Sequence, residues 1–405
     1  MIIRRENFGG ILYDETTGDV SFVDKIFFRT LELIQKKIKN SLIKKRLETE
    51  FDSKIDINDL DACIYKFSEN LLVRLNNYVE EKNNCINPIT IIWIYTNICN
   101  LHCIHCARNC ICYNDFELNL NEAKKVVDEF NEMGIFELRF SGGEPLLRLD
   151  NLLEIGKYAN NLGFKLKIET NGLLASKVNS KRLYNAGFKY AQVSIEGSQR
   201  IHDIIRGRYT YEKAVEGINN LIDQKISVII ATTISNCNKE EIDNIIQIAL
   251  KFGVTGIKFT RYMPIGKGLK NIDMFHISST DEEKIKYTLL QAQDDYNKYL
   301  KITFNSFSEN WECPAGRFLS CLMPTGEVTV CPTMGDLGIN EGNIRSKKFR
   351  KLWSYGKLFN NIRDNGYISC SSCKGVSKKN INMFYQSYNK LLTIKDISNL
   401  TYLNN

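Results

Sequence analysis

Short apolar runs and amphipathic helical stretches alternate through the middle of the chain. Apolar residues in the helical stretches recur at three- and four-residue steps, and LNEAKKVVDEFNEMG is a clear example that stops at Gly134. The strand candidates are TIIWIYT (90–96), FELRFSGG (136–143), KLKIET (165–170), YAQVSIEG (190–197), ISVIIATT (226–233) and TGIKFTRY (255–262). Six strand–helix units predict an α/β fold with a parallel sheet over residues 86–270, either doubly wound or a partial (β/α)6 barrel.

The first 85 residues follow a different pattern. GGILYDETTGDVSFVD (9–24) has two alternating stretches around a Thr-Gly turn, which predicts a β-hairpin. FFRTLELIQKKIKN (27–40) and INDLDACIYKFSENLLVRL (57–75) have helical spacing. A hairpin with short helices is the outline of a winged helix, so residues 1–85 are expected to form a small winged-helix-like α+β domain. The linker NNCINPIT follows it.

A basic run, KKIKNSLIKKR (36–46), lies between the two helical stretches. It is interpreted either as a solvated helix face or as a contact for an acidic partner. Because DNA-binding winged helices have the same outline, a nucleic-acid partner is a third alternative at this point.

The last third of the chain divides into two parts. SSTDEEKIKYTLLQAQDDYNKYLK predicts a long helix that connects, over residues 271–305, to a C-terminal domain at 306–405. That domain is expected to have short, turn-rich strands. It carries Cys313, Cys321, Cys331, Cys370 and Cys373.

Composition narrows the class of protein. No run of about 18 uncharged apolar residues occurs, and MIIRRENFGG lacks the apolar core of a signal peptide, so a cytoplasmic protein without a membrane partner is expected. The net charge of +7 over 405 residues is too mild to indicate nucleic-acid binding. Thirteen cysteines in a reducing compartment favour metal ligation over disulfides.

Three cysteines directly follow the first predicted barrel strand. Cys99, Cys103 and Cys106 have CxxxCxxC spacing, at the barrel end where such folds place active sites. Closed zinc and iron–sulfur sites use four ligands, so three thiolates leave one metal position open. The alternative is a zinc site whose fourth ligand is His102, His105 or Cys110.

Polar groups also end the next three predicted strands. SGGEP (141–145) ends the second strand, ETNG (169–172) the third, and VSIEGSQRIHDIIRG (193–207) the fourth. A single polar residue after a strand is usually a helix cap. Together, however, these segments bring polar groups to the same end of four consecutive strands.

These motifs resemble those of radical S-adenosylmethionine (radical SAM) enzymes over roughly residues 90–265. CNLHCIHC is similar to the family's CxxxCxΦC motif, and SGGEP is similar to its glycine-rich strand end. The resemblance implies a partial barrel with a [4Fe–4S] cluster on Cys99, Cys103 and Cys106. It implies S-adenosylmethionine contacts by His105, Gly142, Gly143, Glu144, Asn171, Ser194 and Arg206. Ser194 and Arg206 are candidates for its carboxylate, since Arg pairs such groups.

The resemblance also implies the chemistry. An electron from the reduced cluster, supplied by a donor such as flavodoxin or ferredoxin, would cleave the cofactor into methionine and a 5′-deoxyadenosyl radical, which abstracts hydrogen. Cys110 and Cys112 follow the cluster motif closely. They are interpreted as buried small side chains or, alternatively, as hydrogen donors near the substrate.

The C-terminal cysteines resemble the Twitch and SPASM extensions of radical SAM enzymes. Their spacing, with Gly326 before Cys331 and a later CSSC, lacks the further cysteines of a full SPASM domain. The resemblance implies one auxiliary [4Fe–4S] cluster on Cys313, Cys331, Cys370 and Cys373. Cys321 is expected to be structural, although a second cluster that uses it stays open. A zinc ribbon is the alternative.

The N-terminal hairpin and helices resemble the recognition element of peptide-modifying enzymes, which binds a leader peptide as an added strand. The three-part order resembles maturases of ribosomally made peptides, above all sactionine-forming enzymes. The expected activity is therefore hydrogen abstraction from a precursor peptide, with a thioether as the leading product and carbon–carbon cross-links or epimerisation as alternatives. A radical SAM dehydrogenase or cofactor-biosynthesis enzyme, and more remotely an iron–sulfur DNA-binding regulator, are the competing functions.

Overall fold

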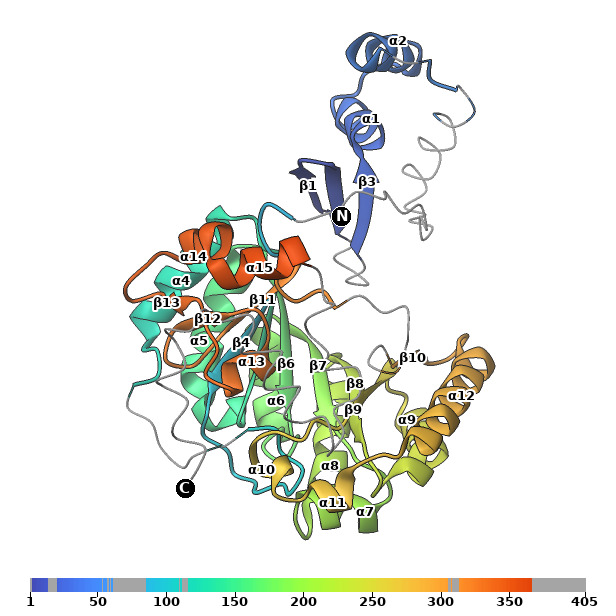
Figure 1. The fold of residues 1–405 in the computed structure, drawn as a ribbon, viewed down its shortest axis with the longest axis vertical. Coiled ribbons are helices and arrows are strands. Elements are labelled where there is room, and N and C mark those ends of the chain that lie inside the picture. Colours follow the sequence, from blue (N-terminus) through green and yellow to red (C-terminus); the bar gives the residue numbers. More distant parts are fainter. Residues whose placement is uncertain are drawn as a thin grey trace. The chain divides into compact units, whose positions relative to one another are not determined.

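The structure is a computed structural model in which two compact units can be distinguished, residues 1–86 and 87–405 (Figure 1). The described residues are 2–13, 20–52, 54–56, 58, 60, 85–108, 110, 116–304, 307 and 313–365.

The first unit is a three-stranded antiparallel sheet followed by helices. Its sheet has the order β1-β2-β3, and the predicted hairpin is confirmed by the pairing of β2 with β3. The predicted helix over 27–40 is interrupted, because α1 ends at Gln35 and α2 begins at Asn40. The helix predicted over 57–75 lies almost entirely outside the described residues. The element bounds are β1 (Ile2–Glu6), β2 (Gly9–Tyr13), β3 (Val20–Asp24), α1 (Lys25–Gln35) and α2 (Asn40–Phe51).

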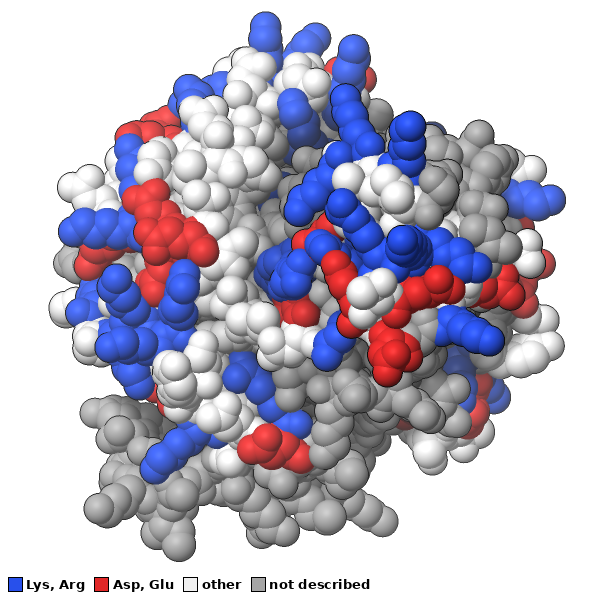
Figure 2. All heavy atoms as spheres, turned by 90° about the horizontal axis from the view of Figure 1, so that it is seen from above, with Lys and Arg blue, Asp and Glu red and all other residues white. Residues whose placement is uncertain are grey.

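Local contacts explain this arrangement. The Asp24 side chain accepts a hydrogen bond from the Phe27 amide and so caps α1. A Cβ at Gly10 would lie 1.9 Å from the Phe28 ring, so this glycine lets β2 pack directly on α1. Figure 2 shows Lys and Arg side chains gathered over this unit beside a group of Asp and Glu.

The second unit contains one ten-stranded sheet, with the order β10-β9-β8-β7-β6-β5-β4-β11-β12-β13. The six predicted strands are confirmed as β4–β9, all parallel, and the α/β partial-barrel fold is confirmed with them. Their bounds are β4 (Thr90–Thr96), β5 (Glu137–Gly142), β6 (Lys165–Thr170), β7 (Phe188–Ser194), β8 (Ser227–Ile234) and β9 (Gly256–Arg261).

Helices cover one face of this sheet (Figure 1). The longer ones are α4 (Leu120–Glu132), α5 (Leu149–Asn161), α6 (Lys177–Asn185), α7 (Gln199–Arg206), α8 (Thr210–Asp223), α9 (Ile242–Phe252) and α12 (Ser279–Tyr296). Shorter ones are η1 (Pro145–Arg148), η2 (Lys239–Glu241), α10 (Gly266–Leu269) and α11 (Ile272–Phe275). Alternate strand residues, such as Leu138, Phe140 and Ile168, join helix residues in one core, which leaves the intervening residues on the opposite, inner face.

The C-terminal segment extends the same sheet. β11 (Leu319–Leu322) pairs in parallel with β4, and β12 (Glu327–Thr329) and β13 (Gly342–Asn343) follow as antiparallel strands. β10 (Lys301–Thr303) extends the opposite edge beside β9. α13 (Pro332–Asp336), α14 (Phe349–Tyr355) and α15 (Lys357–Asn365) complete the described elements.

Aromatic packing joins this segment to the barrel core. Phe349 of α14 meets Phe130 of α4 edge-on at 4.9 Å, and Phe130 in turn meets Trp93 of β4. The domain limits drawn from the sequence remain predictions. None of the helices in the described part of the chain is long and apolar enough to cross a membrane.

Candidate active site

The loop after β4 carries the predicted cluster cysteines. The Leu101 amide donates to Cys99 Sγ at 3.4 Å, and the Arg108 amide donates to Cys106 Sγ at the same distance. Arg206 Nη1 lies 3.9 Å from Cys103 Sγ. Each sulfur therefore faces an N–H donor, an arrangement that favours thiolates and tunes iron–sulfur clusters.

A fourth cysteine, Cys110, lies against the same loop. Its thiol donates to Cys99 and Cys106, which lowers the pKa of both and brings that of Cys106 to about 5. Burial instead raises the pKa of Cys103 to about 11. Within the described ranges, no three Cys, His, Asp or Glu side chains are already assembled around a metal position. Cys112 lies outside these ranges, so the roles predicted for Cys110 and Cys112 remain predictions.

The two glycines of SGGEP allow the second strand end to meet the cysteine loop. A Cβ at Gly142, whose φ is +132°, would lie 2.3 Å from the Thr96 carbonyl oxygen, and one at Gly143 would lie 2.1 Å from that of Ile98. The Gly143 amide donates to Thr96 O at 2.7 Å, and the Glu144 amide donates to Ile98 O at 2.8 Å. The glycines are thus required by backbone packing, a role that the sequence did not indicate.

Glu144 connects the ends of β5 and β6. Its buried carboxylate accepts from Thr170 Oγ1 at 2.7 Å, from the Asn171 amide at 2.8 Å and from the Leu146 amide at 3.1 Å. Asn171 Nδ2 continues to Asn100 Oδ1 at 2.8 Å, within the cysteine loop. Because the chain itself supplies these donors, the contacts of Glu144 are those of a positioning residue.

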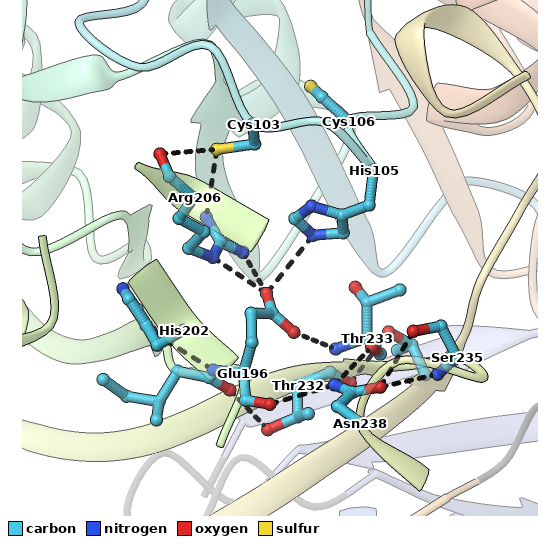
Figure 3. Close-up of polar contacts among 12 residues, drawn as sticks. Cys103, His105, Cys106, Glu196, His202, Arg206, Thr232, Thr233, Ser235 and Asn238 are labelled. Atoms are coloured by element: carbon cyan, nitrogen blue, oxygen red, sulfur yellow. Dashed lines mark hydrogen bonds and ion pairs between the residues drawn. The ribbon is translucent and has the colours of Figure 1, made fainter. Parts of the chain in front are cut away.

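Glu196 is the centre of a second polar cluster, which Figure 3 shows beneath the cysteine loop. Its Oε1 accepts from Arg206 Nε at 2.8 Å and Nη2 at 2.5 Å, and it lies 3.3 Å from His105 Nε2. Its Oε2 accepts from the Thr233 amide at 3.0 Å. Burial alone would raise the pKa of Glu196, but Arg206 and His105 outweigh it and hold this pKa well below its usual range.

Glu196 orients Arg206 and His105, two residues that were predicted to contact the cofactor. Arg206 gives two nitrogens to Glu196 and directs the third at Cys103. Nδ1 of His105 is buried and has no partner among the described residues, so a ligand beside it would meet an unsatisfied nitrogen. Ser194 ends β7 at the same edge and is half-buried. The thiols, His105 and Arg206 thus fit, by their chemistry, a cluster and a bound S-adenosylmethionine.

A tight turn after β8 supports Glu196 from below (Figure 3). Asn238 Nδ2 donates to the carbonyls of Glu196 and Thr233, each at 3.0 Å, while Asn238 Oδ1 accepts from Ser235. Thr232 Oγ1 donates to Ile195 O at 2.6 Å. The backbone that carries Glu196 is therefore tied to the neighbouring strand.

His202 is the other titratable group of this cluster. Its Nδ1 accepts from the Glu196 amide at 3.3 Å, and its Nε2 has no partner among the described residues. Burial lowers the pKa of His202 to about 4, so the imidazole is neutral in the folded protein.

Two ion pairs at this edge were missed by sequence reasoning. Glu117 accepts from the Asn97 amide at 2.7 Å, Thr96 Oγ1 at 3.0 Å and Arg148 Nη1 at 2.8 Å. An acidic residue shortly before an amphipathic helix is usually interpreted as part of a helix cap, so no local pattern indicated these contacts of Glu117. The second pair, Arg108 with Asp336, joins the cysteine loop to α13 at 2.9 Å.

The predicted auxiliary cluster is described only in part. Cys313 and Cys331 are half-buried, and Cys331 Sγ accepts from the Met334 amide at the start of α13. Cys370 and Cys373 lie outside the described residues, so this ligand set remains a prediction. Cys321 is fully buried beside Ile94 and Met323, as a structural cysteine would be.

Comparisons with known proteins agree with the cysteine motif. Residues 93–249 match the family model described as the Radical SAM superfamily. The chain is 28% identical over 306 residues to the mycofactocin maturase MftC of Mycolicibacterium smegmatis, which covers 71% of this chain and 75% of that protein. It is 29% identical over 304 residues to the AdoMet-dependent heme synthase of Methanosarcina barkeri. This match covers 68% of this chain and 85% of the heme synthase.

A solved structure shares the fold over nearly the whole chain. Streptococcus suis SuiB bound to its precursor peptide SuiA superimposes with a TM-score of 0.66 at 16% identity, covering 92% of this chain and 91% of SuiB. At this identity the match establishes the fold and nothing further.

The first prediction concerns Gly143. In Gly143→Ala the new methyl group would overlap the Ile98 carbonyl, so the cysteine loop must move, at a cost of about 1–3 kcal/mol. We expect a lower unfolding midpoint in urea and less bound iron per chain after anaerobic reconstitution. The control is Gly253→Ala, where φ is +64° and nothing lies within 4 Å, so only backbone strain is added. Equal iron content in the wild type and Gly143→Ala would contradict this packing role.

The second prediction concerns acid stability. The pKa of His202 falls from 6.5 to about 4 on folding, so below pH 6.5 the unfolded chain takes up the proton first and stability is lost as the pH falls. This loss amounts to roughly 3 kcal/mol by pH 4. In His202→Asn, the free energy of unfolding should therefore depend less steeply on pH between 6.5 and 4. Parallel curves for the two proteins would show that His202 is not buried in its neutral form.

Proposed function

This chain is a radical SAM enzyme, and on that premise we propose that it modifies a ribosomally made precursor peptide. The observation that carries the proposal is the order of its parts: a small unit of one sheet and helices precedes the barrel, and SuiB, bound to a precursor peptide, shares the fold over 92% of this chain. The similarity to a mycofactocin maturase supports the same reading.

We propose that residues 1–85 bind the leader segment of that peptide. Among the described residues of this unit, β1 and β3 each have a strand neighbour on one side only, so an extended peptide would have two sheet edges to extend. The basic run at 36–46 begins directly after α1 and continues into α2, and its exposed basic residues are Lys36, Lys37, Lys39, Lys45 and Arg46. An acidic leader would complement this charge.

The proposed chemistry assigns a task to each group at the barrel edge. When bound, the [4Fe–4S] cluster and S-adenosylmethionine supply a carbon radical that removes hydrogen from the substrate. Cys99, Cys103 and Cys106 would hold the cluster. Glu196 orients Arg206 and His105 toward the cofactor, and Glu144 orients Asn171. Ser194 would complete the cofactor contacts.

The C-terminal segment is proposed to hold one auxiliary [4Fe–4S] cluster on Cys313, Cys331, Cys370 and Cys373. Such a cluster could accept the electron that remains when the new bond closes. Reduction would come from a small protein such as flavodoxin or ferredoxin. A thioether is the proposed product, and a carbon–carbon cross-link is the alternative. Epimerisation would instead need Cys110 or Cys112 as a hydrogen donor.

A second candidate function has one specific observation in its favour. The chain covers 85% of a heme synthase at 29% identity, so a radical SAM enzyme with a small-molecule substrate is compatible with the same barrel. That enzyme would not need residues 1–85, whereas the peptide maturase would. A DNA-binding regulator would show steep salt-dependent binding to DNA and would release no deoxyadenosine.

Anaerobic co-expression tests the proposal. The chain is produced together with short reading frames adjacent to its gene, and each peptide is examined by mass spectrometry. We expect a loss of two hydrogens per modified site in one peptide. The loss should disappear with Cys99→Ala and with deletion of residues 1–85, and it should persist with Cys237→Ala, a cysteine outside the loop.

Two outcomes would contradict peptide cross-linking. Activity that survives deletion of residues 1–85 would favour a small-molecule substrate. Unchanged peptide masses, together with release of deoxyadenosine, would leave epimerisation, which a mass does not reveal. Acid hydrolysis and chiral amino-acid analysis of the same peptides would then detect it.

A further inference from the structure

The inner face of the barrel sheet is unusually rich in charge. Side chains alternate along each strand between the face covered by helices and the inner face. The inward-facing residues of β5, β6 and β9 include Glu137, Arg139, Lys165, Lys167, Glu169 and Lys258. Four of these are cationic and two are acidic. The inner positions of the neighbouring strands β7 and β8 are uncharged, among them Tyr190, Gln192, Ala231 and Thr233.

Strand register brings two of the lysines near the candidate active site. Lys167 lies between Arg139 of β5 and Tyr190 of β7. Lys258 is opposite Ala231, which is opposite Ser194, so a small side chain separates Lys258 from a predicted cofactor contact. Glu169 pairs in register with Gln192, one inward-facing position closer to the cysteine loop than Lys167.

Most of these charges have a close partner, whereas two lysines have only a more distant one, Glu169. Arg139 pairs with Glu137, and the Lys165 ammonium lies over the Tyr190 ring, 3.9 Å from its centroid. Among the described residues, no hydrogen bond or ion pair joins Nζ of Lys167 or of Lys258 to an acceptor. Both lysines are half-buried, and an ammonium group that is partly removed from water without a close acceptor is a candidate for a ligand contact.

The pKa shifts of these groups agree with the lack of a close acceptor for the two lysines. Burial lowers the pKa of Lys167 to about 7, with repulsion from Arg139 adding to it, and burial also lowers the pKa of Lys258. Burial would raise the pKa of Glu169, but Lys258, Lys167 and Arg139 outweigh it and hold it below its usual value. One carboxylate thus faces two lysines, so Glu169 does not neutralise both of them when both are protonated.

Gln192 adds a neutral polar group to the same place. Its Oε1 is buried and has no partner among the described residues, so it is available to accept an N–H. Two ammonium groups without a hydrogen-bonded acceptor among the described residues, and one unpaired amide oxygen, together match a short peptide segment that carries a carboxylate beside a backbone amide.

We propose that Lys167 and Lys258 bind one carboxylate of the substrate peptide on the inner face of the barrel, while Gln192 accepts a peptide N–H. The proposal rests on the proposed function and adds the substrate feature that the barrel recognises. The carboxylate comes either from an Asp or Glu side chain or from the peptide's C-terminus.

The position of this site limits which carbon reacts. Successive inward-facing residues on a strand are about 7 Å apart, so Lys167 lies roughly that far below the strand end that bears Glu169. If the lysines hold a substrate carboxylate at this depth, the carbon that reacts at the carboxyl edge of the sheet belongs to the residue that carries the carboxylate or to the next residue of the peptide. The modified position is therefore expected beside an acidic residue or at the C-terminus.

Lysine footprinting tests the site without knowledge of the peptide. The full-length chain is acetylated under single-hit conditions with millimolar N-acetylglycine, which carries an α-carboxylate, or N-acetylaspartate α-amide, which carries a side-chain carboxylate. N-acetylglycinamide is the neutral control. When the concentration of the probe is about twice its dissociation constant, we expect Lys167 and Lys258 to be acetylated about threefold more slowly. The acetylation rate of Lys189, which is exposed on the outer surface, should not change. The better-protecting probe identifies the source of the carboxylate.

Variants extend the test to catalysis. With the peptide found by co-expression, Lys258→Gln and Lys167→Gln should each raise KM roughly tenfold, the loss of about 1.4 kcal/mol. Lys258→Arg should restore much of it, and Lys189→Gln should behave as wild type. Thermal melts check that each variant is folded.

The outcomes separate this inference from the proposed function. Equal acetylation with and without carboxylate, or equal protection by the neutral amide, would overturn the site even if a peptide is modified. Protection without any modified peptide would support the carboxylate site and contradict a peptide as its source. A peptide modified equally well by Lys258→Gln would also overturn the proposal.

Discussion

A buried carboxylate must be given donors by the protein around it, and Glu196 is the clearest case in this chain. Its oxygens receive Arg206, His105 and the Thr233 amide, which come from α7, the cysteine loop and β8. One side chain thus fixes three segments at the carboxyl edge of the sheet. If one of these segments moved, the buried Glu196 carboxylate would lose a donor. The three segments are therefore held in fixed positions relative to one another.

Two further glutamates at the same edge also accept hydrogen bonds from separate segments of the chain. Glu117 fixes the start of the cysteine loop to the Asn97 amide, and Glu144 joins the end of β5 to the Asn171 amide after β6. The cysteines sit on the loop that these carboxylates hold, so the positions of the three thiols follow from contacts made by other residues. Below this fixed edge, the inner face of the sheet carries the lysines that we propose bind a substrate carboxylate.

Local patterns were enough to predict the strands but not the network between them. β4 and β6 coincide with TIIWIYT and KLKIET, because both the apolar residues of a strand and the residues that end it are local features of the sequence. The pairing of β11 with β4 depends on contacts more than two hundred residues apart, which no local pattern contains. Gly142 and Gly143 were expected only as contacts of S-adenosylmethionine, whereas the structure shows that they also let the backbone of the cysteine loop approach β5 closely. Glu117 carried no local signal, because its partners Thr96 and Asn97 lie at the end of β4, some twenty residues earlier in the chain.

The most direct test of this account is the cleavage of S-adenosylmethionine itself. The full chain, reconstituted with iron and sulfide under anaerobic conditions and reduced with dithionite, is incubated with the cofactor, and 5′-deoxyadenosine is quantified. The account predicts release by the wild type and by Cys237→Ala, and none by Cys103→Ala. Deoxyadenosine formation by Cys103→Ala at the wild-type level, or none by a wild type that holds its cluster, would contradict it.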